Sequence, residues 1–238
     1  ALPALDGSNL TGVASTENIR TNTNATFLQN INVGVAITAG KLGIGFTDTN
    51  TKVGNTALDS LTTGTHNTAV GENALTASTT GSHNVAVGSG ALDANTTGNY
   101  NYALGKDALG ANTTGSVNVA IANALGSNTT GENNIAIGSN SLNDNTTGGQ
   151  NVALGRQALG DNTTADNNTA VGHNALFYNT TGGNNTAIGR DALKANTTAS
   201  NSVAIGYFAL VGNTTGTQNI AIGVETLDAN TTGSYNVA

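Results

Sequence analysis

The stretch from Asn84 to Gly98, NVAVGSGALDANTTG, contains the pattern that decides the fold. With the spacer residues Asn99 and Tyr100 it completes one repeat unit, and the next unit begins at Asn101 with the same order of apolar, glycine and Asn-Thr-Thr positions. The first residue, or anchor, of each unit stands at 50, 67, 84, 101, 118, 134, 151, 168, 185, 202, 219 and 236. Self-similarity at a short fixed period indicates a repeat protein in which each unit is one structural repeat.

Each unit begins with an alternation of residue types that predicts a short strand. Asn84, Val85, Ala86 and Val87 run polar, apolar, small, apolar, and Gly88 follows. Period two over a few residues, ended by glycine, is typical of a strand and a sharp turn. Asn and Gly tolerate positive φ, so Asn-Thr-Thr-Gly is expected to close a coil. The pattern therefore predicts an all-β fold, a parallel β-solenoid or β-roll with 17-residue rungs.

A leucine stands at the eighth position after the anchor in every complete unit except the short one that starts at Asn118. Stacked rungs bring equivalent residues within about 4.8 Å of each other, so these leucines should form a buried ladder while the spacer residues stay exposed. The predicted structural ladder includes Leu75, Leu92, Leu109, Leu142, Leu159, Leu176, Leu193, Leu210 and Leu227.

The unit that starts at Asn118 is one position shorter than the others, because the next anchor is already reached at Asn134. In this unit Ala122 stands where the other units have glycine. Because alanine does not adopt the glycine conformation freely, we expect a local irregularity between Ala120 and Leu125. The chain divides into an N-terminal β-rich linker or shoulder module, residues 1–49, and a solenoid of about eleven repeats, residues 50–238.

Each rung contains few large apolar side chains, and one coil by itself buries little apolar surface against the entropy lost on ordering its residues. Variable apolar residues such as Val85 and Ile135 offer a second apolar surface. We therefore expect a homotrimer with parallel subunits, in which the small residue Ala86 and its equivalents allow close approach of the coils.

The composition argues against several functions. Only 9% of the residues are charged and the seven Lys and Arg are scattered, so no basic patch for nucleic acid is expected. No apolar run approaches the roughly 20 residues of a membrane helix, and the absence of Cys excludes disulfides. We expect no catalytic residues, no metal site and no cofactor, and interpret His66 and His83 as stacked polar filler or interface packing.

Aromatic residues are scarce, but four of them gather within a short part of the chain. Phe177 and Tyr178 follow one ladder leucine, and Tyr207 and Phe208 precede another. The functional interpretation is a surface-contact patch that stacks against carbohydrate. The structural interpretation is decoration of the turns or packing at an intersubunit rim.

The strings NTAVG, NVAVG, SVAIG and NIAIG resemble the head repeats of trimeric autotransporter adhesins, which are left-handed trimeric parallel β-rolls. The 17-residue form, NTTGxxNTAVGxxAL, is more similar to repeats in the tail fibres and other virion proteins of tailed phages. The segments Leu5–Val13 and Asn22–Asn30 resemble linker modules of marine cyanophage fibres. The repeat resemblance covers about four-fifths of the chain.

The resemblance implies a left-handed coil and a non-enzymatic shaft of a phage tail fibre, located in the virion, that spaces and presents a host-recognition tip. Its partners would be two further copies of the chain, other tail or baseplate proteins and, through another segment, a host cell-surface glycan or outer-membrane receptor. The alternative is the head domain of a trimeric adhesin on a bacterial surface. Ladders of threonine also suggest an ice-binding solenoid, although adjacent threonines in a strand point to opposite faces.

Overall fold

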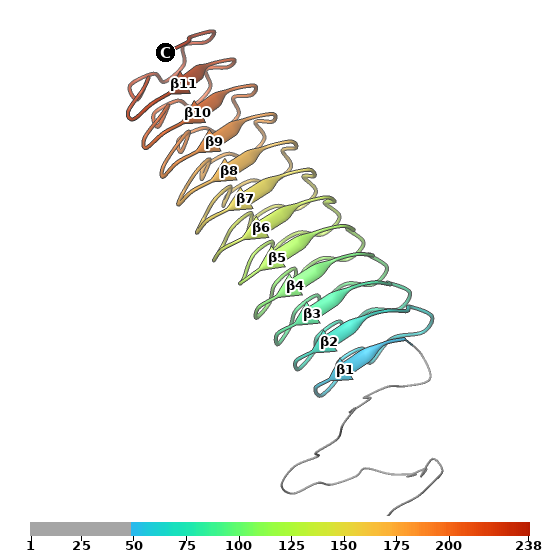
Figure 1. The fold of residues 1–238 in the computed structure, drawn as a ribbon. Helices are drawn as coiled ribbons and strands as arrows, with labels where there is room; N and C mark the ends of the chain where they lie inside the picture. Colours follow the sequence, from blue (N-terminus) through green and yellow to red (C-terminus); the bar gives the residue numbers. More distant parts are fainter. Residues whose placement is uncertain (1–48) are drawn as a thin grey trace, which may run out of the picture. The chain divides into compact units, whose positions relative to one another are not determined.

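The computed structural model describes residues 49–238, which form a solenoid of eleven parallel strands in a single sheet, with neighbours in chain order (Figure 1). The strands are β1 (Thr51–Val53), β2 (Thr68–Val70), β3 (Val85–Val87), β4 (Tyr102–Leu104), β5 (Val119–Ile121), β6 (Ile135–Ile137), β7 (Val152–Leu154), β8 (Thr169–Val171), β9 (Thr186–Ile188), β10 (Val203–Ile205) and β11 (Ile220–Ile222). No helix occurs among the described residues. The predicted all-β parallel solenoid is confirmed. The module expected at residues 1–49 lies outside the described residues, apart from Thr49.

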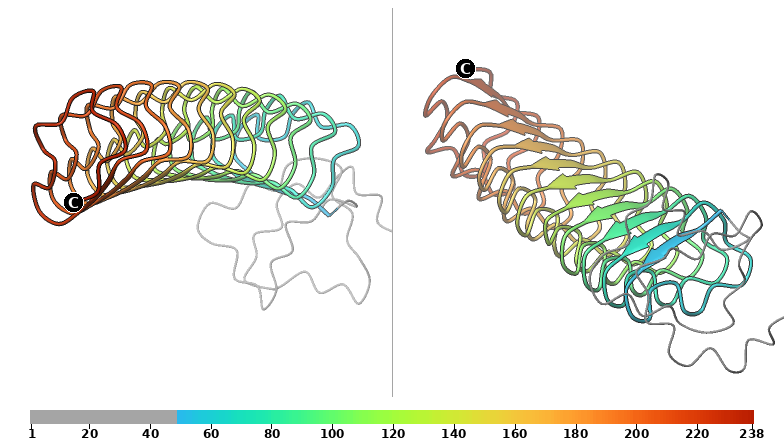
Figure 2. Two further views of the ribbon diagram at one scale, coloured as in Figure 1. Left: turned by 90° about the horizontal axis from the view of Figure 1, so that it is seen from above. Right: turned by 60° about the horizontal axis from the view of Figure 1, so that its bottom comes forward.

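Each residue pairs with its equivalent one rung later. In β3 and β4, Ala86 pairs with Ala103, and the same register holds along the sheet. Backbone hydrogen bonds continue this pairing outside the strands: the Leu92 N–H donates to the Ala108 carbonyl (3.0 Å) and the Thr96 N–H to the Thr113 carbonyl (2.8 Å). The coils therefore lie one above another around the whole circumference, as the two views of Figure 2 show.

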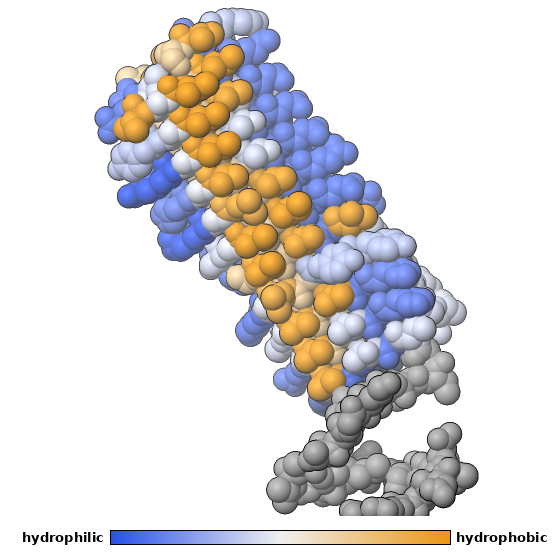
Figure 3. Space-filling model, in the orientation of Figure 1, coloured by the Kyte–Doolittle hydropathy of each residue, from blue (hydrophilic) through white to orange (hydrophobic). Residues whose placement is uncertain are grey.

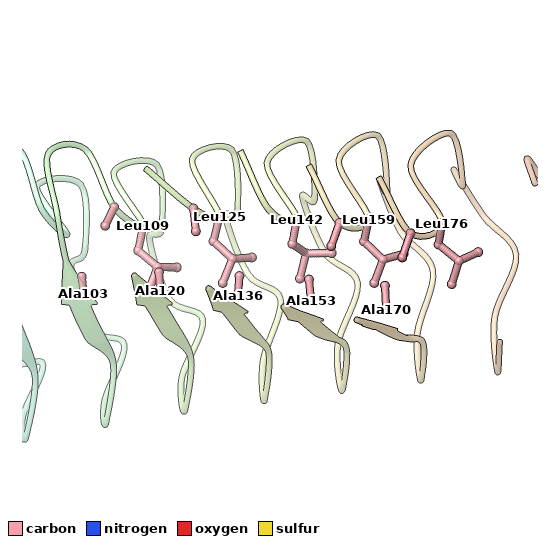
Figure 4. Packing of buried hydrophobic residues seen from close by; sticks show 14 of the residues in the cluster. Ala103, Leu109, Ala120, Leu125, Ala136, Leu142, Ala153, Leu159, Ala170 and Leu176 are labelled. Atoms are coloured by element: carbon pink, nitrogen blue, oxygen red, sulfur yellow. The ribbon is translucent and has the colours of Figure 1, made fainter. Parts of the chain in front are cut away.

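The core is a thin column inside the coil. In the rungs drawn in Figure 4, the strand alanines from Ala103 to Ala170 and the ladder leucines from Leu109 to Leu176 face each other across the interior. The central alanine of each strand from β2 to β11 is buried. The leucines from Leu75 to Leu210 have no exposed surface, and Leu227 packs against the core while partly buried. The turn residue Ser139 and the spacer residue Tyr100 are both exposed. The predicted burial of the leucine ladder is thus confirmed.

The role expected for the strand alanines was wrong. Ala86 and its equivalents point into their own coil and are buried there, so they do not allow close approach to a second coil. Alternation along the strand then places the two flanking residues on the outer face of the sheet.

The ladder leucines have a backbone conformation that side chains rarely adopt. All of them have φ between 49° and 53°, as Leu142 (49°) and Leu92 (53°) show. The left-handed region costs about 1–2 kcal/mol for a residue with a Cβ. Burying a leucine side chain gains about 1.5–3 kcal/mol, which offsets that cost. Leucine therefore occupies a turn position that glycine would fit with less backbone strain.

The glycine after each strand is required by both conformation and space. Gly88 has φ 139°, and a Cβ there would lie 2.4 Å from the carbonyl oxygen of Gly105. In the short unit, Ala122 instead has φ 71°, although its N–H still donates to the Leu104 carbonyl (2.8 Å). The turn that follows β5 is correspondingly shorter than in other rungs. The predicted irregularity between Ala120 and Leu125 is confirmed.

Two ladders of buried asparagine accompany the leucines. In the anchor ladder, the Asn101 backbone N–H donates to Asn84 Oδ1 (2.9 Å), and Asn101 Nδ2 donates to the Gly115 carbonyl (2.8 Å). In the Asn-Thr-Thr ladder, Asn162 Nδ2 donates to Asn145 Oδ1 (2.9 Å) and to the Ala165 carbonyl. These bonds compensate the cost of burying the amides.

The Asn-Thr-Thr ladder begins only at Asn95, because the equivalent position is Ser78 in the preceding rung and Leu61 in the rung before that. The Oγ of Ser78 is buried without a hydrogen-bond partner. Asn95 Nδ2 donates to the Gly98 carbonyl (3.1 Å), while its Oδ1 accepts from Asn112 (2.9 Å). An asparagine at position 78 would offer the missing Oδ1 acceptor to Asn95.

We predict that Ser78→Asn stabilises the fold. One added hydrogen bond in place of an unpaired hydroxyl should contribute about 1 kcal/mol, which raises the thermal midpoint by about 2–4 °C in a unit of this size. Circular dichroism melting measures the change. Ser89→Asn, at an exposed turn, is the matched control and should leave the midpoint unchanged; an equal or lower midpoint for Ser78→Asn would contradict the ladder argument.

Candidate functional site

The outer face of the sheet presents a continuous apolar band, visible in orange along the solenoid in Figure 3. We define the apolar stripe as the first and third residues of β1 to β11. The third residue is Val, Leu or Ile in every strand, and the first is apolar or Tyr in seven strands and Thr in the other four. Leu104 is 51% exposed and Ile222 59% exposed.

The apolar stripe is long and narrow. Ten strand spacings of about 4.8 Å give a length of roughly 48 Å, and two residues per strand give a width of roughly 10 Å. Its area is then on the order of 500 Å², at the upper end of what soluble monomers expose in one patch. The sequence predicted a second apolar surface, and the structure places it on the outer face of the sheet.

A second ladder on the surface consists of stacked rings. His66 and His83 have ring centroids 4.7 Å apart at an interplanar angle of 2°, and Tyr100 continues the stack at 4.8 Å. The predicted stacking of His66 on His83 is confirmed. Among residues 49–238, no group of three or more His, Cys, Asp or Glu is arranged to hold a metal ion.

The threonine pairs divide between two roles. Thr96 is half-buried, and its Oγ1 donates to the Thr113 carbonyl (3.0 Å), whereas Thr97 is exposed. Equivalent bonds recur along the ladder, for example from Thr129 to Thr146 (3.0 Å). The first hydroxyl of each pair thus stabilises the stack of coils, and a single row of threonines faces outward.

The four aromatic residues form two separate pairs. Phe177 and Tyr178 meet edge-to-face with centroids 4.6 Å apart, and Tyr207 and Phe208 do so at 4.3 Å. The pairs lie two rungs apart, and within residues 49–238 no ring contact joins them. The intervening rung contributes Arg190, whose guanidinium lies 5.7 Å from the Tyr207 ring centroid. The four residues thus form two pairs on alternate rungs with Arg190 on the rung between them, and their joint action as a surface-contact patch stays a prediction.

The rung that contains Arg190 is organised around a buried carboxylate. Only 3% of the Asp191 side chain is exposed, and its oxygens lie 3.0 Å from Arg190 Nε and 3.2 Å from Lys194 Nζ. Asn174 Nδ2 donates to it from the previous rung (3.0 Å). Burial alone would raise the pKa of Asp191, but the hydrogen bonds from Asn174 and Lys194, with the charges of Lys194 and Arg190, outweigh burial and hold the pKa below its ordinary value.

A small cavity of about 130 Å³ lies beside the first aromatic pair. It is lined by side chains of three consecutive rungs, among them Gln157, Asp161 and Phe177. Burial and the nearby charge of Asp144 raise the pKa of Asp161. Sequence reasoning missed this cavity. The available signal was Gly160, a residue without a side chain at a ladder position that has Asn143 in the previous rung and Phe177 in the next.

Comparison with protein-family models, curated proteins and solved structures found no match. No helix in the described part of the chain is long and apolar enough to cross a membrane. On its fold, the chain is a parallel β-solenoid repeat protein with 17-residue rungs, and its surface combines one apolar stripe with locally varied turns.

We predict that Asp191→Asn destabilises the fold at pH 7 by about 1–2 kcal/mol, because the charge-assisted bonds to Arg190 and Lys194 are lost. A lowered pKa means that the carboxylate stabilises the fold above its unfolded pKa of about 4 and loses this effect as the pH falls through the folded value. Denaturant unfolding at pH 7 and at pH 2.5 tests this prediction.

The difference in the free energy of unfolding between wild type and Asp191→Asn should be smaller at pH 2.5 than at pH 7. Glu225→Gln, at an exposed turn, is the control and should have little effect at either pH. A loss of the same size at both pH values would show that the carboxylate charge does not stabilise this rung.

Proposed function

We propose that residues 50–238 form a segment of a non-enzymatic structural shaft that spaces and stiffens a fibre. The observation that carries the proposal is the unbroken register of the eleven strands. Each inner rung is hydrogen-bonded to both neighbours, in the strands and in the turns, so bending the stack requires many bonds to stretch together. The repeat number then sets the length of the shaft.

A phage tail fibre is the assembly that we propose for this shaft. The 17-residue repeat, with its Asn-Thr-Thr turn, supports a virion protein, as do the residues before the repeats that resemble cyanophage linker modules. Other tail or baseplate proteins would be its structural partners, and another segment would contact the host receptor. The alternative is the head of a trimeric adhesin, which the strings SVAIG and NIAIG support.

The apolar stripe is proposed as the contact between copies of this chain in a parallel homotrimer. The stripe has the same repeat as the rungs, so parallel copies aligned rung by rung present matching side chains along its length. One stripe of about 500 Å² is smaller than the roughly 800 Å² that each partner contributes to a stable interface. Around a threefold axis each chain contacts two others, and flanking residues such as Tyr100 (49% exposed) and Val117 (50% exposed) add area.

We predict that sedimentation of the purified chain at micromolar concentration gives three chains per particle. A double change in the apolar stripe, Ile137→Asp with Leu154→Asp, should abolish the trimer because it buries unpaired charges at the contact. Ser139→Asp, between β6 and β7 at an exposed position, should leave it intact. A stable, folded wild-type monomer would rule out the trimer.

We predict that antibodies against the chain label tail fibres. Immunogold electron microscopy of phage particles and of bacteria from the same source distinguishes the two proposed settings. Gold along fibres that project from phage tails supports the shaft, whereas gold on bacterial envelopes in the absence of phage supports the adhesin. Preimmune serum is the control.

A further inference from the structure

The cavity beside Phe177 originates in a gap of a side-chain ladder. Asn143, Gly160 and Phe177 each stand at the ninth position after their anchors, so they lie one above another on consecutive rungs. Since Gly160 has no side chain, the nearest residues with side chains at this ladder position, Asn143 and Phe177, are two rung spacings, or about 9.6 Å, apart. The Phe177 ring leans over this gap: a Cβ on Gly160 would lie 2.6 Å from its Cε2 atom.

Polar groups surround the gap on both sides. Asn140 and Gln157 come from the turn after the strand, and Asp144 and Asp161 come from the residues after the ladder leucine. Within residues 49–238, neither the Gln157 amide nor the Asp161 carboxylate has a side-chain hydrogen-bond partner. Asn140 uses its Oδ1 to accept from Asn123 (2.6 Å), which leaves its Nδ2 as a donor toward a ligand. Donors and acceptors thus converge beside an aromatic ring.

We propose that this gap is a binding site for one sugar residue of a neutral saccharide. The aromatic ring offers an apolar surface to the C–H groups of a pyranose, while amides and carboxylates can bind adjacent hydroxyls as both donors and acceptors. A few convergent polar groups around an apolar surface are the usual composition of a small-molecule site.

The size and charge of the site restrict the ligand. The volume of about 130 Å³ corresponds to roughly four water molecules at about 30 Å³ each and is below the roughly 300 Å³ of sites for drug-sized ligands, so it suits part of a single ring. No cation in the described part of the chain pairs with Asp144 or Asp161. Both carboxylates therefore disfavour the binding of a negatively charged ligand. Uronic and sialic acids are therefore disfavoured. The proposal concerns a contact on the side of the shaft and does not rest on the proposed function.

Saturation-transfer NMR on the full chain tests the proposal with methyl glycosides of glucose, galactose, mannose and N-acetylglucosamine, and with glucuronic and sialic acid as acidic probes. At least one neutral glycoside should bind with a dissociation constant on the order of 1 mM, as expected for a ligand of this size, and neither acid should bind as well. Phe177→Ala should weaken this binding at least tenfold.

Gly160→Ala is the sharper variant, because its Cβ displaces the end of the Phe177 ring rather than backbone and should leave the fold intact. It should also abolish binding. Gly110→Ala, at the same ladder position three rungs earlier, is the matched control and should bind like wild type. Melting curves confirm the fold of each variant.

The proposed site would be overturned if no neutral glycoside binds, or if an acidic probe binds more tightly than the neutral ones. Binding that persists in both Phe177→Ala and Gly160→Ala would also overturn it. The oligomeric state, measured on the same samples, reports separately on the shaft.

Discussion

The structure depends on the alignment of each residue with its equivalent on the next rung. Backbone hydrogen bonds in the strands and in the turns hold this register, and every other feature follows from it. A polar residue can be buried because the same residue one rung away completes its hydrogen bonds, as Asn145 does for Asn162. Where the ladder changes identity, as at Ser78, a buried hydroxyl is left without a partner. The interior is therefore uniform because each buried residue contacts the equivalent residue of the next rung.

The same register allows the fold to tolerate strain in a thin core. Each ladder leucine adopts a left-handed backbone at about 1–2 kcal/mol, and the gain from burying its side chain is of similar size. One coil thus gains little net stability from its interior, while the apolar stripe remains exposed on its outer face. The proposed trimer would bury the stripe without any change in the coil, which is why the assembly and the shaft function are linked.

Much of the variation lies in the turns, where it creates local chemistry while the leucine ladder is kept. Asp191 binds two cations and an amide at one rung, and Gly160 opens a gap under the ring of Phe177. Both features depend on residues from neighbouring units, which are distant in the chain and adjacent in the stack. A solenoid built in this way can gain a binding surface through a few substitutions in its turns, because the backbone that supports them does not change.

The sequence by itself determined the repeat, the parallel solenoid, the buried leucine ladder and the irregular rung near Ala122, because a fixed period with recurring residue types leaves one way to stack the units. It did not determine which side of the strand faces inward, since alternation defines two faces equally well. The direction of Ala86 was therefore predicted wrongly. Only the tertiary structure decided the left-handed backbone of the leucines, the buried Asp191 and the cavity at Gly160, because each depends on contacts between rungs rather than on the order of residues within one.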